Sequence, residues 1–212
     1  MAVNVWSNVQ IAVQSALGAN KTITGITKAN PAAVTSTSHG ISNGAYVTLS
    51  VQGMWQLDQV VARVANVAAN TFELEGIDST AYDTFTSGTA NEVTFGTTLS
   101  SISDINVSGG EFAMVDVTTI HDNVKKEIPG SASPVSISMT ANWDPADAGL
   151  VALKTASDAR AQRAIRFTFS DSKKWVFNGY IGCTLSPTGQ AQNKVSTPLT
   201  ITAYGKPRAY TS

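Results

Sequence analysis

The chain has 212 residues, enough for one large domain or two small ones that each bury a core. Its charged fraction of 14% is well below the roughly 25% of an average globular chain, and its formal net charge is -1. No basic cluster is longer than a pair (Lys125-Lys126 and Lys173-Lys174), which argues against tight binding to the phosphates of nucleic acids. A surface with so few charges favours burial against copies of the same chain.

Cysteine content and hydropathy exclude several kinds of site and cellular location. Cys183 is the only cysteine, which rules out an intrachain disulfide and thiolate zinc sites of the zinc-finger type. Residues Met1 to Gly18 lack a cationic start followed by an apolar run, so no signal peptide is predicted. No stretch reaches the roughly 18 apolar residues of a membrane span, so we expect synthesis and folding in a cytoplasm, without a membrane partner.

Alternation of apolar and polar residues with period two dominates the chain. This pattern places apolar side chains on one face of a strand and polar ones on the other, as in antiparallel sheets with one wet face. We therefore expect a mainly β fold. The alternating runs lie at residues 9–17, 47–51, 60–64, 71–74, 135–141, 165–169 and 199–203.

One segment predicts a helix, at about residues 145–158. Asp144 is the expected N-cap, Pro145 the first helical residue, and Asp147 a favourable charge in the first turn. Gly149 is expected to weaken the helix modestly. The apolar stripe consists of Ala146, Leu150 and Leu153.

A shift in composition and turn signals divides the chain. Residues 21–90 are predicted to form a small inserted β-rich domain, and residues 1–20 and 91–212 a larger β domain. The inserted segment holds three bases against five acids, a net charge of -2, and the remainder carries +1. An insertion at the tip of a hairpin tolerates such extra chain, and its two ends should lie close together.

The residues that most often carry chemistry do not gather into a site. His39 precedes Gly40 in a turn, and His121 follows Ile120; for both, a surface turn residue is the better interpretation than a metal ligand or a catalyst. Cys183 lies inside a strand pattern, where a buried structural thiol is expected rather than a nucleophile.

Other candidate sites have structural explanations as well. Asp144 and Asp147 could act as an acid/base pair, but a helix cap and a first-turn charge explain both. Ser108-Gly109-Gly110 lacks the third glycine and the Lys-Ser/Thr of a phosphate loop, so an ordinary turn is expected. The four tryptophans are scattered, and packing in a core or an interface is the default for them. We predict no enzyme activity and no catalytic, cofactor or metal-binding residue.

The order of short motifs in the C-terminal part resembles the major tail tube protein of bacteriophages with long non-contractile tails. The resemblance covers roughly residues 91–208 and the first strand. It is carried by Val115-Asp116-Val117-Thr118-Thr119, Lys125-Lys126-Glu127-Ile128-Pro129-Gly130, Asp144-Pro145-Ala146-Asp147-Ala148-Gly149, Arg166-Phe167, Trp175-Val176-Phe177-Asn178-Gly179-Tyr180-Ile181 and Leu199-Thr200-Ile201-Thr202-Ala203-Tyr204-Gly205-Lys206-Pro207.

The inserted segment resembles a different phage module, a small β-rich domain labelled after the first catalytic-cysteine half-domain of ubiquitin-activating enzymes. Because residues 21–90 contain no cysteine, thioester chemistry is not carried over. The residues of this resemblance are Ile23-Thr24-Gly25-Ile26, Thr37-Ser38-His39-Gly40-Ile41-Ser42-Asn43-Gly44, Gly53-Met54, Asn70-Thr71-Phe72-Glu73-Leu74 and Asp78-Ser79-Thr80-Ala81-Tyr82.

The first resemblance implies a structural virion protein with a β-sandwich and one flanking helix. Proteins of that family form hexameric rings in which the inner strands of all six subunits join into one cylindrical sheet. Stacked rings make the tube through which DNA leaves the phage. The implied partners are other copies of the chain and the tape measure, terminator and baseplate proteins of the tail, with DNA only in transit.

The segment at about residues 91–130 is the part of the chain that we expect to contact a neighbouring ring. It is long, rich in Ser, Gly and Thr, and only partly strand-like, and long loops inside compact domains are usually functional. We expect part of it to reach a neighbouring ring. The candidate inter-ring contacts are Lys125, Lys126 and Glu127, with an ordinary solvated charge cluster as the alternative.

Three alternative functions compete with this interpretation. Another tail component (terminator, baseplate or decoration protein) shares the fold class. A carbohydrate-binding adhesin needs an aromatic platform, which the scattered 8% of aromatic residues does not predict. A hydrolase needs a catalytic arrangement that the chain does not display.

Overall fold

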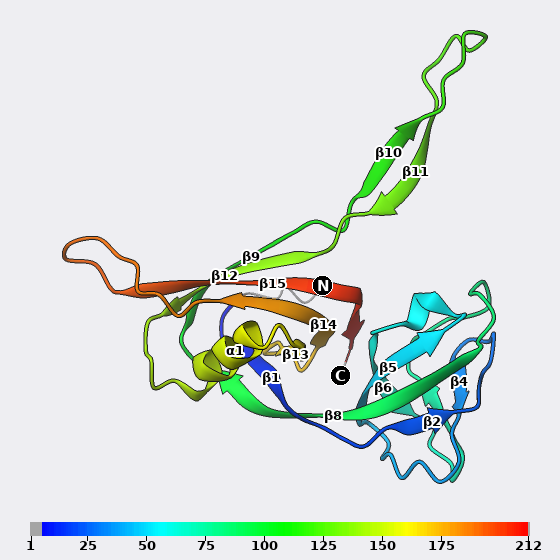
Figure 1. Cartoon of the computed structure of the whole chain (residues 1–212), viewed down its shortest axis with the longest axis horizontal. Coiled ribbons are helices and arrows are strands. Elements are labelled where there is room, and N and C mark those ends of the chain that lie inside the picture. The colour runs from blue at the N-terminus through cyan, green and yellow to red at the C-terminus, as the bar shows by residue number, and fades with distance from the viewer. Residues whose placement is uncertain (1–5, 212) are drawn as a thin grey trace.

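The computed structural model describes residues 6–211, and it is mainly β, with 50% strand and 7% helix. The expected fold class is confirmed: most strands form a large curled antiparallel sheet, with a single α-helix in the described part of the chain (Figure 1). The strands are β1 (Gln10–Leu17), β2 (Lys21–Ile23), β3 (Gly25–Ile26), β4 (Ala32–Thr35), β5 (Tyr46–Gln52), β6 (Val61–Ala65), β7 (Thr71–Leu74), β8 (Ser87–Leu99), β9 (Ile102–Ser108), β10 (Phe112–Asp116), β11 (Glu127–Ala132), β12 (Ser136–Asn142), β13 (Gln162–Thr168), β14 (Lys174–Cys183) and β15 (Ser196–Tyr210); the helices are η1 (Trp55–Leu57) and α1 (Ala148–Asp158).

The larger part of the molecule, here called the body, is one curled sheet in the order β8-β1-β13-β14-β15-β12-β9. The alternation seen in the sequence decides which side chains enter its core. In β12, Ile137, Met139 and Ala141 are buried, and in β15 the same holds for Leu199 and Ile201. Helix α1 packs on the sheet and adds its buried apolar face to this core (Figure 1).

The helix begins later than its sequence predicted. Asp147 is the N-cap: its Oδ1 accepts hydrogen bonds from the backbone N–H of Gly149 (2.7 Å) and Leu150 (3.1 Å). The prediction of Asp144 as the cap was wrong, because its carboxylate instead accepts from the N–H of Ala146 (2.9 Å) in a turn before the helix. The helix ends at Asp158, as predicted.

Gly149 has a packing reason to lie in the first helical turn. A Cβ at this position would lie 2.6 Å from Leu99 Cδ2 and 2.7 Å from the carbonyl oxygen of Thr98. Glycine therefore lets α1 approach β8 closely, which outweighs its lower helix propensity.

The corrected cap can be tested by substitution. We expect Asp147→Ala to lower the free energy of unfolding by about 1 kcal/mol, because two helix N–H groups lose their acceptor. Asp144→Ala is the matched control and should cost less, because the Asp144 side chain accepts only from the N–H of Ala146, before the helix begins. Urea denaturation followed by circular dichroism measures both. An equal or larger cost for Asp144→Ala would contradict the assignment.

Strands β2 to β7 and the first part of β8 form a second part of the molecule, which lies beside the body and is here called the module (Figure 1). It has its own core, in which Val47, Leu49, Phe72 and Leu74 are fully buried. The chain enters and leaves the module side by side, since Lys21 pairs with Ala90. Strand β8 continues through residue 90 into the body (Figure 1). Of the two domain boundaries that we propose, the one at residues 90/91 therefore lies within a strand that both parts share.

A third, smaller core joins the module to the body. Tyr46 and Val61 of the module pack with Val93, Val176 and Tyr210 of the body. Hydrogen bonds cross the same joint: the backbone N–H of Arg63 donates to Tyr210 Oη (2.8 Å), Asn178 Nδ2 to Gln59 Oε1 (3.4 Å) and Arg208 Nη2 to Tyr82 Oη (3.3 Å). The module is thus packed against β14 and β15 and is not held by its two connections alone.

Residues 91–130 contain more strand than expected. The end of β8, all of β9 and β10, and most of β11 lie in this range, and only the connection at residues 117–126 is a long loop. None of the helices in the described residues is long and apolar enough to cross a membrane.

Candidate assembly surface

Strands β10 and β11, with the loop at residues 117–126, form an arm that stands away from the rest of the molecule (Figure 1). The two strands pair only with each other, with Val115 opposite Ile128 and Asp116 opposite Glu127. At the base, the N–H of Gly110 donates to the carbonyl of Ser133 (3.1 Å). An isolated two-stranded hairpin is at best marginally stable in water, so the arm lacks the support that a third strand or a core supplies.

Two glycines allow the chain to turn from β9 into the arm. Gly109 and Gly110 both have φ of 85°, a left-handed conformation that favours glycine. A Cβ on Gly109 would also lie 2.2 Å from the carbonyl oxygen of Pro134. Ser108-Gly109-Gly110 is therefore a turn, as expected, and it changes the direction of the chain between β9 and the arm.

The arm carries many exposed apolar side chains. Every residue from Glu111 to His121 is exposed, and Ile120 reaches 97% exposure. Large exposed apolar surfaces mark contacts with other molecules, because soluble proteins rarely leave them in water. The exposed apolar residues of the arm are Phe112, Met114, Val115, Val117, Ile120, Val124 and Ile128.

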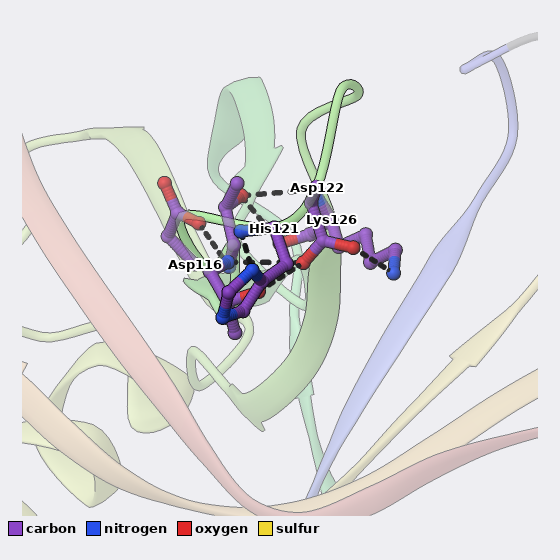
Figure 2. Close-up of polar contacts among 6 residues, drawn as sticks. Asp116, His121, Asp122 and Lys126 are labelled. Atoms are coloured by element: carbon purple, nitrogen blue, oxygen red, sulfur yellow. Dashed lines mark hydrogen bonds and ion pairs between the residues drawn. The ribbon is translucent and has the colours of Figure 1, made fainter.

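Polar contacts give the loop at the end of the arm a defined shape (Figure 2). Asp122 Oδ2 accepts hydrogen bonds from the N–H (3.0 Å) and the hydroxyl (2.9 Å) of Thr119, and its other oxygen pairs with the ammonium of Lys126. Asp116 Oδ1 accepts from the N–H of Thr118 (2.8 Å). These contacts order the loop that carries the exposed Ile120.

Two of the three predicted contact residues, Lys125 and Lys126, end this loop, and Glu127 is the first residue of β11. The structure pairs them within the arm: Lys125 with Glu127 (2.5 Å), and Lys126 with Asp122. These charged residues border the exposed apolar side chains of the arm, which were not among the residues predicted from the sequence. The available signal was the run Phe112 to Val117, which is as apolar as a core strand, yet alternation alone does not reveal whether a strand will be covered.

Both aspartates of the loop have a lowered pKa. Hydrogen bonding to Lys126, and then to Thr119, lowers the pKa of Asp122; hydrogen bonding to Thr118 lowers that of Asp116. A lowered pKa means that the ordered loop prefers the charged carboxylate. Its contribution to order is therefore present above the ordinary pKa of 3.8 and is lost as the pH falls through the lower value in the folded loop.

This dependence can be followed by NMR. In an acid titration we expect the amide resonances of Thr118 and Thr119 to hold their positions down to about pH 4 and to shift only below the ordinary aspartate pKa. Asp122→Asn is the control, in which the step at Thr119 should vanish while that at Thr118 remains. A midpoint at or above 3.8 for both amides would contradict the ordered loop.

The remaining candidate residues His39, His121 and Cys183 lie in different parts of the described fold. His39 is buried, at 1% exposure, so its interpretation as a surface residue was wrong: Nδ1 accepts from the N–H of Ile41 (3.0 Å), and Nε2 lies 3.0 Å from the carbonyl oxygen of Ala68. His121 is exposed in the arm. Cys183 is buried, as expected, and burial raises the pKa of its thiol. Within residues 6–211, no three His, Cys, Asp or Glu side chains group as metal ligands.

Comparison with known proteins supports the resemblance noted in the sequence. A family model described as "Phage tail tube protein, TTP" matches residues 52–212, which is 161 of the 212 residues. The match begins inside the module, earlier than the resemblance from residue 91 onward. No curated protein matches the chain.

Among solved structures, one similar chain comes from the tail of an empty GTA particle with C6 symmetry. It is 14% identical, the alignment covers 56% of this chain and 87% of that one, and the TM-score is 0.42. The family match, over about three quarters of the residues, decides the identity and favours a tail tube component over an adhesin or a hydrolase. The chain belongs to the phage tail tube protein family.

Proposed function

We propose that six copies of this tail tube protein join into a ring, that rings stack into a hollow tube, and that each β10–β11 arm docks on a neighbouring ring. The observation that carries this proposal is the arm, whose apolar side chains are exposed in the single chain although the hairpin has no core of its own. Covering these side chains would stabilise the hairpin and the contact together.

The free edges of the curled sheet support ring formation. Strand β9 lies at one end of the order of strands and β3 at the other, so β9 has one side without a strand partner in the described chain. Exposed strand edges tend to pair with further strands, and closing a ring would satisfy them. The scarcity of charged residues suits a protein whose surface is largely covered by its neighbours.

Lys125, Lys126 and Glu127 remain our candidates for salt contacts between rings. They border the apolar residues of the arm, as charged residues commonly border the apolar centre of an interface. In the single chain Lys125 pairs with Glu127 and Lys126 with Asp122. On docking, these residues would form ion pairs with the neighbouring ring, in place of these pairs or in addition to them.

A tail tube of this kind would contain DNA in transit and contact other tail proteins. The lumen would conduct DNA outward, and a lining without dense positive charge would let it slide. Tape measure, terminator and baseplate proteins are the further partners that we propose, in a virion component made in the bacterial cytoplasm. The role is structural and needs no catalytic residue.

The module would decorate the outer wall. Six additional domains do not fit inside a narrow bore, so we assign residues 21–90, with their net charge of -2, to the outside of the tube. The extra core that joins the module to β14 and β15 would hold it at a fixed angle.

The purified protein tests the assembly directly. We expect negative-stain microscopy to reveal rings and tubes, and mass photometry a species near 133 kDa, six times the 22.2 kDa chain. Each contact between subunits should bury at least roughly 1,000 Å². A strictly monomeric protein at high concentration, with no tubes in the microscope, would contradict the proposal; single rings that never stack would favour a terminator.

A further inference from the structure

The joint between module and body contains an excess of positive charge. A pocket of about 390 Å³ lies between them, lined by residues from both parts. Arg63 and Glu75 come from the module, and Arg166 and Lys174 from the body. Three cations therefore face one carboxylate, and groups of like charge are costly to hold together in partial burial unless anions balance them.

The single carboxylate is already engaged. Glu75 binds Arg63 through two hydrogen bonds, from Nε (2.5 Å) and Nη2, in the forked geometry that suits an arginine–carboxylate pair. Neither Arg166 nor Lys174 makes an ion pair within the part of the chain that the structure describes. The guanidinium of Arg166 instead lies over the rings of Phe95 (4.7 Å) and Tyr46 (5.7 Å).

Two donors at this joint lack an acceptor. Nε of Arg166 and the hydroxyl of Tyr46 are buried, and neither finds a hydrogen-bond acceptor among residues 6–211. The side chain of Arg63 hydrogen-bonds to the Tyr46 hydroxyl, but a guanidinium only donates, so the hydroxyl proton still lacks an acceptor. Burial, and then the charges of Arg63 and Arg166, lowers the pKa of Lys174, as expected for an ammonium that lacks a counter-ion.

We propose that this pocket is an anion site, in which one carboxylate or phosphate group bridges Lys174 and Arg166 of the body to the Tyr46 hydroxyl of the module. An oxyanion provides the acceptors that the cluster lacks, and guanidinium and ammonium groups are the usual ligands of such anions. Because its ligands come from both sides of the joint, the bound anion fixes the module against β13 and β14.

The anion has two sources that share this chemistry: free phosphate, and a carboxylate from a second copy of the chain in the tube. The first source is independent of the proposed function, whereas the second rests on it. The experiment therefore has one part on the unassembled protein and one on the tubes, so that a failure of stacking leaves the first part standing.

In the first part, sodium phosphate is titrated into the unassembled full chain by calorimetry, with sodium chloride at matched ionic strength as the reference. We expect one phosphate per chain and about tenfold weaker binding in Lys174→Gln, which loses a charge-assisted contact. Lys173→Gln is the matched control: Lys173 is adjacent in sequence but pairs with Asp171 (2.6 Å) and does not line this pocket, so binding should change less than about twofold.

In the second part, tubes of each variant are exposed to rising salt. If a carboxylate of a second copy fills the site, phosphate binds the unassembled chain but not the tube, and Lys174→Gln tubes come apart at lower salt than Lys173→Gln tubes. If free phosphate is the natural occupant, both the chain and the tube bind it. The proposal is overturned if phosphate binding is absent or equally affected by both variants while their tubes resist salt equally.

Discussion

Removing the arm should abolish tube formation and leave the monomer folded. We would replace Glu111–Ala132 by an Asn-Gly turn that joins Gly110 to Ser133, two residues whose backbones are already hydrogen-bonded (3.1 Å). No residue of the deleted segment is buried, so the thermal midpoint of the body should change little. Its exposed apolar residues are the surface that we assign to the neighbouring ring, so their loss removes the contact.

A milder pair of variants locates the effect within the arm. Ile120→Asp places a charge at the most exposed apolar position of the loop and should reduce assembly strongly, because burying an unpaired carboxylate in a contact is costly. Trp55→Ser, which changes another large exposed apolar side chain (65%) but on the module, is the matched control and should leave the tubes intact. Sedimentation and microscopy measure both.

Hydrogen exchange gives a second readout of the same idea. Across residues 91–130, protection should rise on polymerisation, most of all in β10 and β11, because the hairpin has no covering layer in the single chain. Equal protection in monomer and tube, or tubes that form without the arm, would remove it from the interface.

Replacing the module should narrow the tube without closing or widening its bore. In this variant residues 22–89 give way to a short Gly/Ser linker between Lys21 and Ala90, which are paired in the structure. If the module decorates the outer wall, the truncated chain polymerises into tubes of smaller outer diameter and unchanged bore, measured by cryo-electron microscopy. The truncation should also weaken binding to anion-exchange resin, since the removed residues 22–89 hold two bases and five acids, a net charge of -3.

We expect this truncation to destabilise the body, because the module covers part of it. Val93, Val176 and Tyr210 are buried in part against the module, so its removal exposes them and should lower the thermal midpoint of the body. A second truncated variant with Val93→Thr and Val176→Thr reduces the uncovered apolar surface and guards against aggregation. Loss of tubes from a folded truncated monomer, in both variants, would assign the module to the ring or stacking interface.

The sequence by itself determined the class of fold and the inward-facing residues of most strands. Period-two alternation identified the core residues of β12 and β15, such as Ile137 and Ile201, because successive side chains of a strand point to opposite faces. Local chemistry placed the helix and its end at Asp158, but it chose Asp144 over Asp147 as the cap, since both carboxylates suit a helix start and only the backbone geometry selects one.

The tertiary structure decided which surfaces stay uncovered and which charges meet. Strand β10 is as apolar as a core strand, yet it is exposed because the sheet provides no further strand or layer beside it. Arg63 and Arg166 are 103 positions apart and meet only because the module packs on β13 to β15. Alternation records the two faces of a strand, but burial and charge clustering depend on contacts between distant segments, which local sequence patterns do not encode.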